Sequence, residues 1–190
     1  MLRQITHFLL DTAFGFFVFV LLARFYLQLM RAPFRNPLGH FVTALTNWVV
    51  LPARRLVPGM FGLDLASLLL AWLIEVLLLF LLYLLKGGGL GSASGTLAGV
   101  LFSLALLELA HFTLYLFIAV ILIQAVISWV NPYAPLAPLF NALTAPFLRP
   151  FRRMVPPIGN VDLSPLFALV TAQLLLIPLE HVTRAVAGLL

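Results

Sequence analysis

The sequence predicts an all-α membrane protein with four transmembrane helices. It predicts two repeats of the same orientation, each with a short interfacial or re-entrant amphipathic helix. Three observations lead to this fold class. Of the 190 residues, 63% are hydrophobic and only 9% are charged, which gives a mean hydropathy of +1.14. Long apolar runs occur in four places, and one loop motif occurs twice. A chain this apolar is expected to be an integral membrane protein.

The four expected spans cover residues 8–30, 64–85, 104–130 and 163–179. A helix needs about 17 to 25 mostly apolar residues to cross the hydrocarbon core of a bilayer, and each run meets this length or slightly exceeds it. The third run is apolar from residue 97 onwards, so we expect that helix to tilt or to begin in the interface. The first is too long for the apolar core of a signal peptide, so we expect it to stay in the mature chain.

The loops after the first and third spans share a motif. Residues 52–58 read PARRLVP, and 98 residues later residues 150–156 read PFRRMVP. At the same offset Pro37 aligns with Pro135, and Asp-Leu follows each copy of the motif. A match that extends this far indicates a duplicated unit. The predicted domains are a first repeat at 1–86, a flexible glycine and serine linker at 87–96 and a second repeat at 97–190.

The distribution of basic residues predicts the orientation in the membrane. Loop 31–63 carries four arginines and loop 131–162 carries three, whereas the other span ends have only Arg3, Lys86 and Arg184. Short loops rich in lysine and arginine stay in the cytoplasm. We therefore expect both motif loops to be cytoplasmic, with both termini and the linker outside. Two spans separate the repeats, so they run in the same direction, unlike the inverted repeats of many transporters.

Each motif loop contains an expected amphipathic helix of about four turns, which is too short to span a bilayer. The apolar stripe of the first helix includes Phe41, Leu45 and Trp48, and the second helix repeats it with Leu136, Leu139, Phe140, Leu143 and Phe147. Either the helices lie in the interface with the apolar face towards lipid, or they dip into the bilayer packed against protein. The prolines at 52, 58, 150 and 156 are expected to end the helical runs.

The repeated arginines are Arg54, Arg55, Arg152 and Arg153. One interpretation is that they set the topology and reach for lipid phosphates. The other is a paired binding surface for anionic lipid headgroups or an acidic partner protein, because guanidinium groups suit phosphate and carboxylate. Nucleic acid is not expected, despite the net charge of +5, because no soluble basic domain carries these residues. Asp64 and Asp162 precede spans and are expected to cap the helices that follow.

Polar side chains inside the expected spans need a partner or a function, because a charge deep in a bilayer is costly. They are Arg24 and Gln28 in the first span, Glu75 in the second, Glu108, His111 and Gln124 in the third, and Gln173 in the fourth. One hypothesis is that these groups pair across helices and fix the packing. The other is a proton or cation pathway through Glu75, Glu108 and His111.

No motif for catalysis, a metal or a cofactor is found. The chain contains no cysteine, which excludes disulfides and thiolate chemistry. Glu108 and His111 form Glu-x-x-His, which is not a zinc-protease motif, and no Gly-x-Ser-x-Gly or phosphate-binding loop is present. We therefore expect a protein that is not an enzyme.

The doubled Pro-x-Arg-Arg-x-x-Pro, the Asp-Leu after each copy and Ser164-Pro165 after the second resemble the YggT/YlmG family of small integral membrane proteins. The resemblance covers residues 17–177, and the chain looks like a two-repeat member. Arg24 resembles a recurrent arginine of this family, whereas the second repeat has Gln124 near that place. In the first repeat, Ala66-Ser67 stands where the family has Ser-Pro.

The resemblance implies a bacterial or plastidial membrane protein without assigned catalytic residues. The family is linked to cell division and envelope morphology, to osmotic or ion homeostasis, and in chloroplasts to cytochrome b6 haem maturation and nucleoid distribution. Two functional hypotheses follow. The first is a non-enzymatic inner-membrane protein that binds lipid, or division and envelope proteins, at its Arg-Arg loops. The second is an ion-transport or ion-homeostasis protein that uses the intramembrane glutamates, histidine and arginine.

Overall fold

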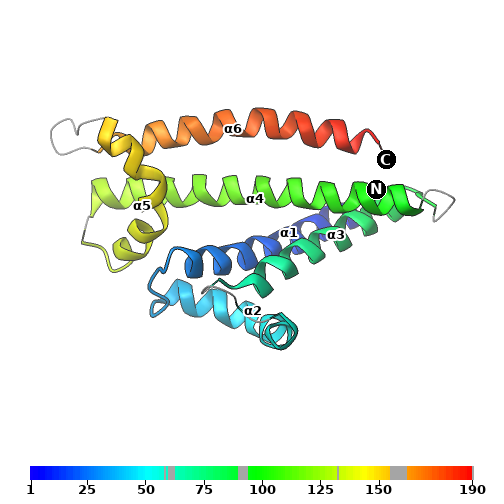
Figure 1. Ribbon diagram of the computed structural model, residues 1–190, viewed down its shortest axis with the longest axis horizontal. Helices are drawn as coiled ribbons and strands as arrows, with labels where there is room; N and C mark the ends of the chain where they lie inside the picture. The colour runs from blue at the N-terminus through cyan, green and yellow to red at the C-terminus, as the bar shows by residue number, and fades with distance from the viewer. Residues whose placement is uncertain (58, 60–62, 90–93, 132, 155–161, 190) are drawn as a thin grey trace.

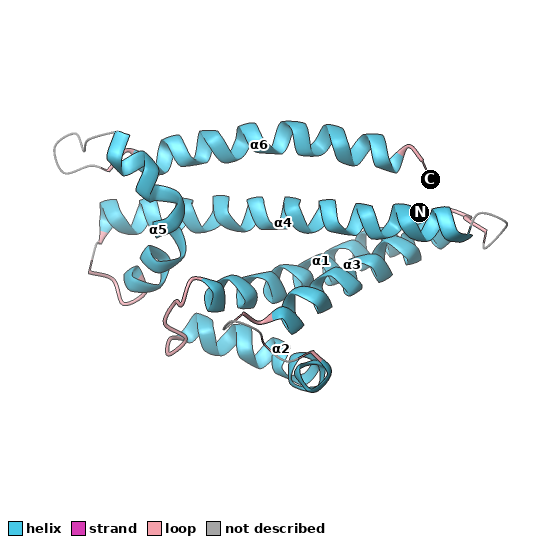
Figure 2. Ribbon diagram, in the orientation of Figure 1, coloured by secondary structure: helices cyan, strands magenta, loops and turns pink. Residues whose placement is uncertain are grey.

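The computed structural model describes residues 1–57, 59, 63–89, 94–131, 133–154 and 162–189. The regular elements of these segments are helices (Figures 1 and 2). In chain order they are α1 (Leu2–Leu29), α2 (Pro37–Leu56), α3 (Leu65–Leu85), α4 (Ser94–Val130), α5 (Ala137–Met154) and α6 (Ser164–Ala187).

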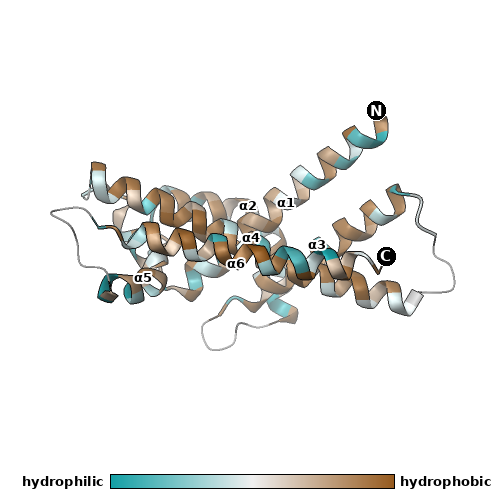
Figure 3. Ribbon diagram, turned by 90° about the horizontal axis from the view of Figure 1, so that it is seen from above, coloured by the Kyte–Doolittle hydropathy of each residue, from teal (hydrophilic) through white to brown (hydrophobic). Residues whose placement is uncertain are grey.

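Four helices, α1, α3, α4 and α6, are long and apolar enough to cross a membrane, which confirms the predicted all-α fold with four candidate transmembrane helices. Figure 3 shows apolar residues along most of their length. Three of them extend beyond the expected spans, at the start of α1 and α4 and at the end of α6. The added turns of α1 and α6 contain Arg3, Glu180 and Arg184. Apolar length measures only the part of a helix that suits hydrocarbon, and a helix continues past it where water or headgroups solvate polar side chains.

The bundle has two distinct ends. Both chain termini lie at one end, and α2 and α5 lie towards the other (Figure 1). We call these the terminus end and the loop end. Helices α1 and α4 both start at the terminus end and run towards the loop end (Figure 1). Helix α1 packs against α3, α4 packs against α6, and contacts between α3 and α4 join the two pairs.

The main core lies where α1 meets the loop helices and the neighbouring spans. Val18, Leu21 and Leu22 of α1 are fully buried there, and the same cluster contains Leu139 and Phe140 of α5. A second, small cluster of Ile121, Leu148 and Ala168 joins α4, α5 and α6. Thus α5 packs its apolar stripe largely against protein. Helix α2 divides its apolar residues, because Val42 and Val50 are buried whereas Phe41 and Trp48 of its stripe are 51% and 70% exposed.

Neither Pro52 nor Pro150 ends its helix, so that expectation was wrong. Helix α2 continues through Pro52 to Leu56, and α5 continues through Pro146 and Pro150 to Met154. Proline lacks one amide donor and crowds the preceding turn, and a helix can absorb both effects by bending. The last turns of α2 are seen end on in Figure 1, at an angle to its first turns. Pro58 and Pro156 lie outside the described residues.

The start of α2 is fixed locally by its sequence. Asn36 is the N-cap, and its Oδ1 accepts a hydrogen bond of 2.9 Å from the amide of Gly39. Pro37 then occupies the first turn, where a missing amide proton costs nothing. A Cβ atom on Gly39 would collide with the backbone oxygen of Phe34, so the turn that brings the chain back from α1 needs glycine at this position. This turn directs α2 back along α1.

Candidate functional site

A buried polar cluster joins α1, α2 and α3 at the loop end. We call it the Asp64 node, and its members are Arg24, Gln28, Thr46, Asn47, Arg54, Asp64 and Ser67. Arg24 and Gln28 lie on α1. Thr46, Asn47 and Arg54 lie on α2, and Asp64 and Ser67 lie at the start of α3. The side chains of Arg24 and Asp64 are only 5% and 1% exposed.

Asp64 is the centre of this node. Its Oδ2 atom accepts hydrogen bonds from Nε of Arg24 over 3.2 Å and from Nη2 of Arg54 over 2.6 Å. The Nε atom of Arg54 donates to Oδ1 of Asp64 over 3.1 Å, which makes the Arg54 contact two-pronged. A two-pronged contact fixes the orientation of both groups. One carboxylate thus neutralises two arginines that come from different helices.

The other hydrogen bonds of Arg24 tie α1 to α2. Its Nη1 atom donates to Oγ1 of Thr46 over 2.6 Å and to Oδ1 of Asn47 over 2.8 Å. Arg54 in turn donates to Oε1 of Gln28 on α1 over 3.2 Å. A buried arginine is tolerated when its donors find partners, and here those partners come from two helices.

Asp64 also caps α3, as expected. Its carboxylate accepts from the amide of Ser67 over 3.4 Å and from the Ser67 hydroxyl over 2.7 Å. Burial alone would raise the pKa of Asp64. The hydrogen bonds from Arg54 and Ser67 and the charges of Arg54 and Arg24 outweigh burial, so the pKa lies below its ordinary value. Asp64 is therefore a carboxylate at neutral pH.

The second repeat has a simpler pair, the Asp162 pair. Nε of Arg152 donates to Oδ2 of Asp162 over 2.9 Å, and the side chains are 41% and 25% exposed. Oδ1 of Asp162 accepts from the amide of Ser164, but the N-cap of α6 is Leu163, so the expectation that Asp162 is the cap residue was wrong. Burial acts to raise the pKa of Asp162, but the Ser164 and Arg152 contacts lower it overall.

The two repeats differ because the second has no counterpart of Arg24 in its cluster. Gln124 of α4 is buried and donates to Oδ1 of Asn141 over 2.7 Å. Its own Oε1 atom and the Oγ atom of Ser164 are buried without a hydrogen-bond partner in the described part of the chain. The second repeat therefore holds its loop helix with fewer polar contacts than the first.

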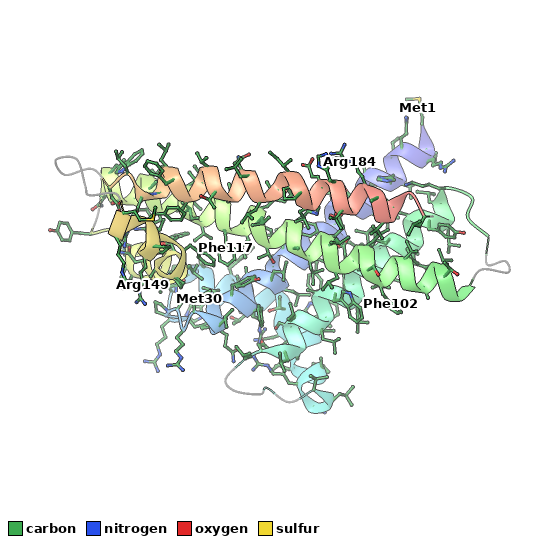
Figure 4. The ribbon with its side chains drawn as sticks, turned by 45° about the horizontal axis from the view of Figure 1, so that its top comes forward. Met1, Met30, Phe102, Phe117, Arg149 and Arg184 are labelled. Atoms are coloured by element: carbon green, nitrogen blue, oxygen red, sulfur yellow. The ribbon has the colours of Figure 1, made fainter. Side chains whose placement is uncertain are left out.

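Each arginine pair is divided between two roles. The first member, Arg54 or Arg152, is paired with an aspartate, whereas Arg55 and Arg153 are exposed. Further exposed arginines at the loop end are Arg31, Arg35 and Arg149. Arg149 and Arg184 lie towards opposite ends of the molecule (Figure 4). The loop end is thus a basic surface.

The remaining intramembrane polar residues lie on α3 (Glu75), α4 (Glu108 and His111) and α6 (Gln173). Glu75 of α3 is 3% exposed, and its Oε2 atom has no hydrogen-bond partner among the described residues. Glu108 and His111 of α4 approach each other, with 3.7 Å between Oε2 and Nδ1. Glu75 and Glu108 interact electrostatically with each other and with Asp11 of α1. Gln173 is exposed on α6, so the repeat partner of Glu75 is not part of this cluster.

Sequence reasoning missed four members of these clusters. Thr46, Asn47 and Ser67 complete the Asp64 node, and Asp11 joins the glutamates. The alignment of the repeats contained a signal for Thr46, because Thr144 stands at the same offset and is also buried. Asp11 carried no such signal, because the second repeat has Leu109 at that offset.

Chemically, the Asp64 node holds three helices together, and the basic surface presents exposed guanidinium donors. Within the described residues, no group of three or more histidine, aspartate or glutamate side chains could hold a metal ion. Glu75 and Glu108 are groups that can take up protons.

Comparison with known proteins gives a family match over most of the chain. The family model described as CCB3/YggT matches residues 3–85 and 103–182. An uncharacterised protein of Pseudomonas aeruginosa is 36% identical over 173 residues, which are 88% of this chain and 84% of the relative. An uncharacterised protein of Vibrio alginolyticus is 38% identical over 167 residues, 87% of this chain and 88% of the relative.

A third relative is the uncharacterised protein YggT of Escherichia coli. It is 29% identical over 184 residues, which are 96% of this chain and 93% of that protein. No solved structure matches the chain.

Proposed function

The chain belongs to the CCB3/YggT family, and from this premise we propose that it is a non-enzymatic inner-membrane protein that binds anionic lipid headgroups with its loop end. Through this contact it supports the organisation of the envelope or of division sites. The observation that carries the proposal is the division of each arginine pair into one anchored and one exposed member.

The anchored arginines support the proposal because they fix where the exposed ones lie. Arg54 is held by three hydrogen bonds within the Asp64 node, and Arg152 is held by Asp162. Arg55 and Arg153 are the next residues on the same helices, so their backbone positions are fixed as well. A group that is already positioned loses less conformational freedom when it binds a phosphate.

Charge and apolar exposure at the loop end are matched to a lipid surface. Each arginine near an anionic leaflet contributes about 1 kcal/mol of attraction. Helix α2 adds exposed Phe41, Trp48 and Leu51, which suit contact with the acyl chains beneath the headgroups. With the loop end in the cytoplasm, as the arginine bias predicts, the surface faces the leaflet that is rich in anionic lipid.

The test is co-purification of lipids and proteins from native membranes in mild detergent, followed by mass spectrometry. The informative variant is R55Q/R153Q, which leaves both aspartate pairs intact. Its control is R3Q/K86Q, which removes the same charge from exposed residues towards the terminus end. The other five loop arginines keep the topology signal in both variants: Arg31, Arg35, Arg54, Arg149 and Arg152.

We expect the R55Q/R153Q protein to lose bound anionic phospholipid and the R3Q/K86Q protein to retain it. Equal lipid content in both variants would contradict the proposal and would leave the arginines as topology determinants. Loss of a co-purified protein with unchanged lipid would instead assign the surface to an acidic partner protein.

A second candidate function is ion transport or ion homeostasis. The observation in its favour is the buried Oε2 atom of Glu75, which lacks a hydrogen-bond partner in the described structure. Under this hypothesis E75Q or E108Q abolishes ion flux in reconstituted vesicles, whereas R55Q/R153Q leaves it unchanged. Under the lipid-binding hypothesis the glutamate variants retain their bound lipid.

A further inference from the structure

Glu75 lies in an unusual place for a carboxyl group. It is the eleventh residue of α3, which has 21 residues, so about 15 Å of helix lies on each side. Its exposed fraction is 3%, and its Oε2 atom has no partner in the part of the chain that the structure describes. A permanently charged carboxylate is costly at such a position. Proton uptake removes the charge without any need for a partner side chain.

The surroundings of Glu75 strengthen this argument. Asp11 of α1 and Glu108 of α4 both interact with it electrostatically, and they also interact with each other. His111 of α4 lies 3.7 Å from Glu108, and its Nδ1 atom is 3.2 Å from the carbonyl oxygen of Leu107. Carboxylates on three neighbouring helices repel one another, so a proton on Glu75 or Glu108 relieves this repulsion. The surroundings therefore favour a proton on these glutamates.

Two pockets reach this cluster, and both are lined by Glu108. One of about 330 Å³ lies between α4 and α6, where Glu180 and Arg184 face Glu108 and His111. The other, of about 610 Å³, extends from Glu108 to Lys86 and the glycines that follow it at the end of α3. The second pocket therefore leads from a carboxyl group to the terminus end of the bundle.

The part of α3 between Glu75 and the Asp64 node is apolar. Helix α3 presents only aliphatic and indole side chains at 68–74, between Ser67 of the Asp64 node and Glu75. On α3 itself no side chain in this stretch can relay a proton as an acid or base. The charged group that α2 places beside α3 is Arg54, which is bound to Asp64 at the far end of the helix.

We propose that Glu75 and Glu108 form a proton-binding site that is loaded from the terminus end. A proton from water in the pocket between Lys86 and Glu108 binds the Glu108 carboxylate. It then passes to the Glu75 carboxylate, so that Glu108 can bind another proton. The ligand is a proton and not a metal ion, because no described group of three acidic or histidine side chains could coordinate one. This inference makes the second candidate function more specific, because it names the proton as the ion and the two glutamates as its site. It does not depend on lipid binding at the loop end.

The first experiment is labelling with dicyclohexylcarbodiimide, which adds to protonated carboxyl groups in apolar surroundings. Full-length protein in lipid vesicles is treated across a pH series, and the modified residue is located by mass spectrometry. We expect the label on Glu75, with less label as the pH rises and no protection by Na⁺ or K⁺. Labelling that does not change with pH, or protection by either cation, would overturn the proton assignment.

Variants identify the site independently of the pH series. E75Q is expected to lose the label, and glutamine is a mild change because the second repeat has Gln173 at this offset. E108Q is expected to slow labelling of Glu75 when the pH is changed. The control is D162N, which changes a partly exposed aspartate at the loop end that is paired with Arg152 and should leave Glu75 labelling unchanged. Full labelling in E75Q would place the reactive carboxyl elsewhere and contradict the site.

Sidedness is tested in right-side-out and inverted membrane vesicles, in which only the external pH is changed. We expect the external pH to control Glu75 labelling in the vesicles that expose the terminus end, and not in those that expose the loop end. Control from the loop end would contradict the proposed access path. Proton flux is not part of either readout, so the site can be established even if no transport is found.

Discussion

The Oδ2 atom of Asp64 lies 3.2 Å from Nε of Arg24, although the two residues are 40 positions apart and belong to different helices. Both side chains are almost fully buried, so removal of one leaves the other charge without compensation. We expect D64A to destabilise the protein by about 3 to 5 kcal/mol. The measurement is the thermal unfolding midpoint in detergent. D162A is the matched control, and we expect it to cost about 1 kcal/mol or less because its ion pair is partly exposed.

Adjacent arginines are expected to have different effects. R54Q removes the two-pronged contact to Asp64 and the bond to Gln28, so we expect a loss of about 1.5 to 3 kcal/mol in stability. R55Q removes the same charge from an exposed position and should change stability by less than about 0.5 kcal/mol. The measurement is the thermal unfolding midpoint of each variant. Equal midpoints would contradict the assignment of Arg54 as the anchored arginine and Arg55 as the exposed one.

The Asp64 node predicts a specific acid sensitivity. Because the contacts hold the pKa of Asp64 below its ordinary value, the node contributes stability above the unfolded-state pKa of about 3.9, and loses it as the pH falls through the lower folded-state value. The contribution should thus be constant from pH 7 to about pH 5 and decline below about pH 4. The check is the difference in unfolding midpoint between wild type and D64N across this range. That difference is expected to shrink at acid pH.

Orientation can be tested with single cysteines, because the chain has none of its own. R153C lies on the exposed loop end and L189C near the exposed C-terminus. We expect a membrane-impermeant maleimide to label L189C in intact spheroplasts and R153C only after permeabilisation. The reverse pattern would place the basic surface outside the cell and contradict the proposed contact with the cytoplasmic leaflet.

Helix α2 is predicted to reach deeper than a purely interfacial helix. The ring of Trp48 lies 5.7 Å from that of Phe17, which is about 18 Å of helix away from the end of α1 at Leu29. Trp129 lies at the end of α4. In single-tryptophan variants we expect lipids brominated deep in the acyl chain to quench Trp48 more than Trp129. Stronger quenching of Trp48 by shallow bromines would favour the interfacial alternative.

Much of the fold could be predicted from patterns along the chain. The four spans and the two loop helices follow from apolar length and from helical spacing, which are local properties. Their ends were less predictable. Pro52 and Pro150 are strong local helix breakers, but both helices continue beyond them, where Arg54 and Arg152 bond to Asp64 and Asp162.

The candidate site was predictable as a set of residues and not as a set of contacts. Arg24 and Asp64 both stood out, one as a charge inside a span and the other as a cap. Their pairing depends on how α1 lies against α3, which no local pattern encodes. Gln173 shows that a match in the repeat does not predict a shared position in the fold. It matches Glu75 in the repeat, but α6 lies at the edge of the bundle, so the side chain is exposed.

The separation between Arg24 and Asp64 also has a consequence for biosynthesis. A ribosome adds about 5 to 20 residues per second, so the 40 residues between the two take about 2 to 8 seconds to make. During that interval α1 carries a buried guanidinium whose counter-charge has not yet been synthesised. Release of α1 into lipid alone would leave this charge in hydrocarbon. The first three helices are therefore expected to leave the insertion machinery together, with the arrival of Asp64 as the step that frees α1 to enter the bilayer.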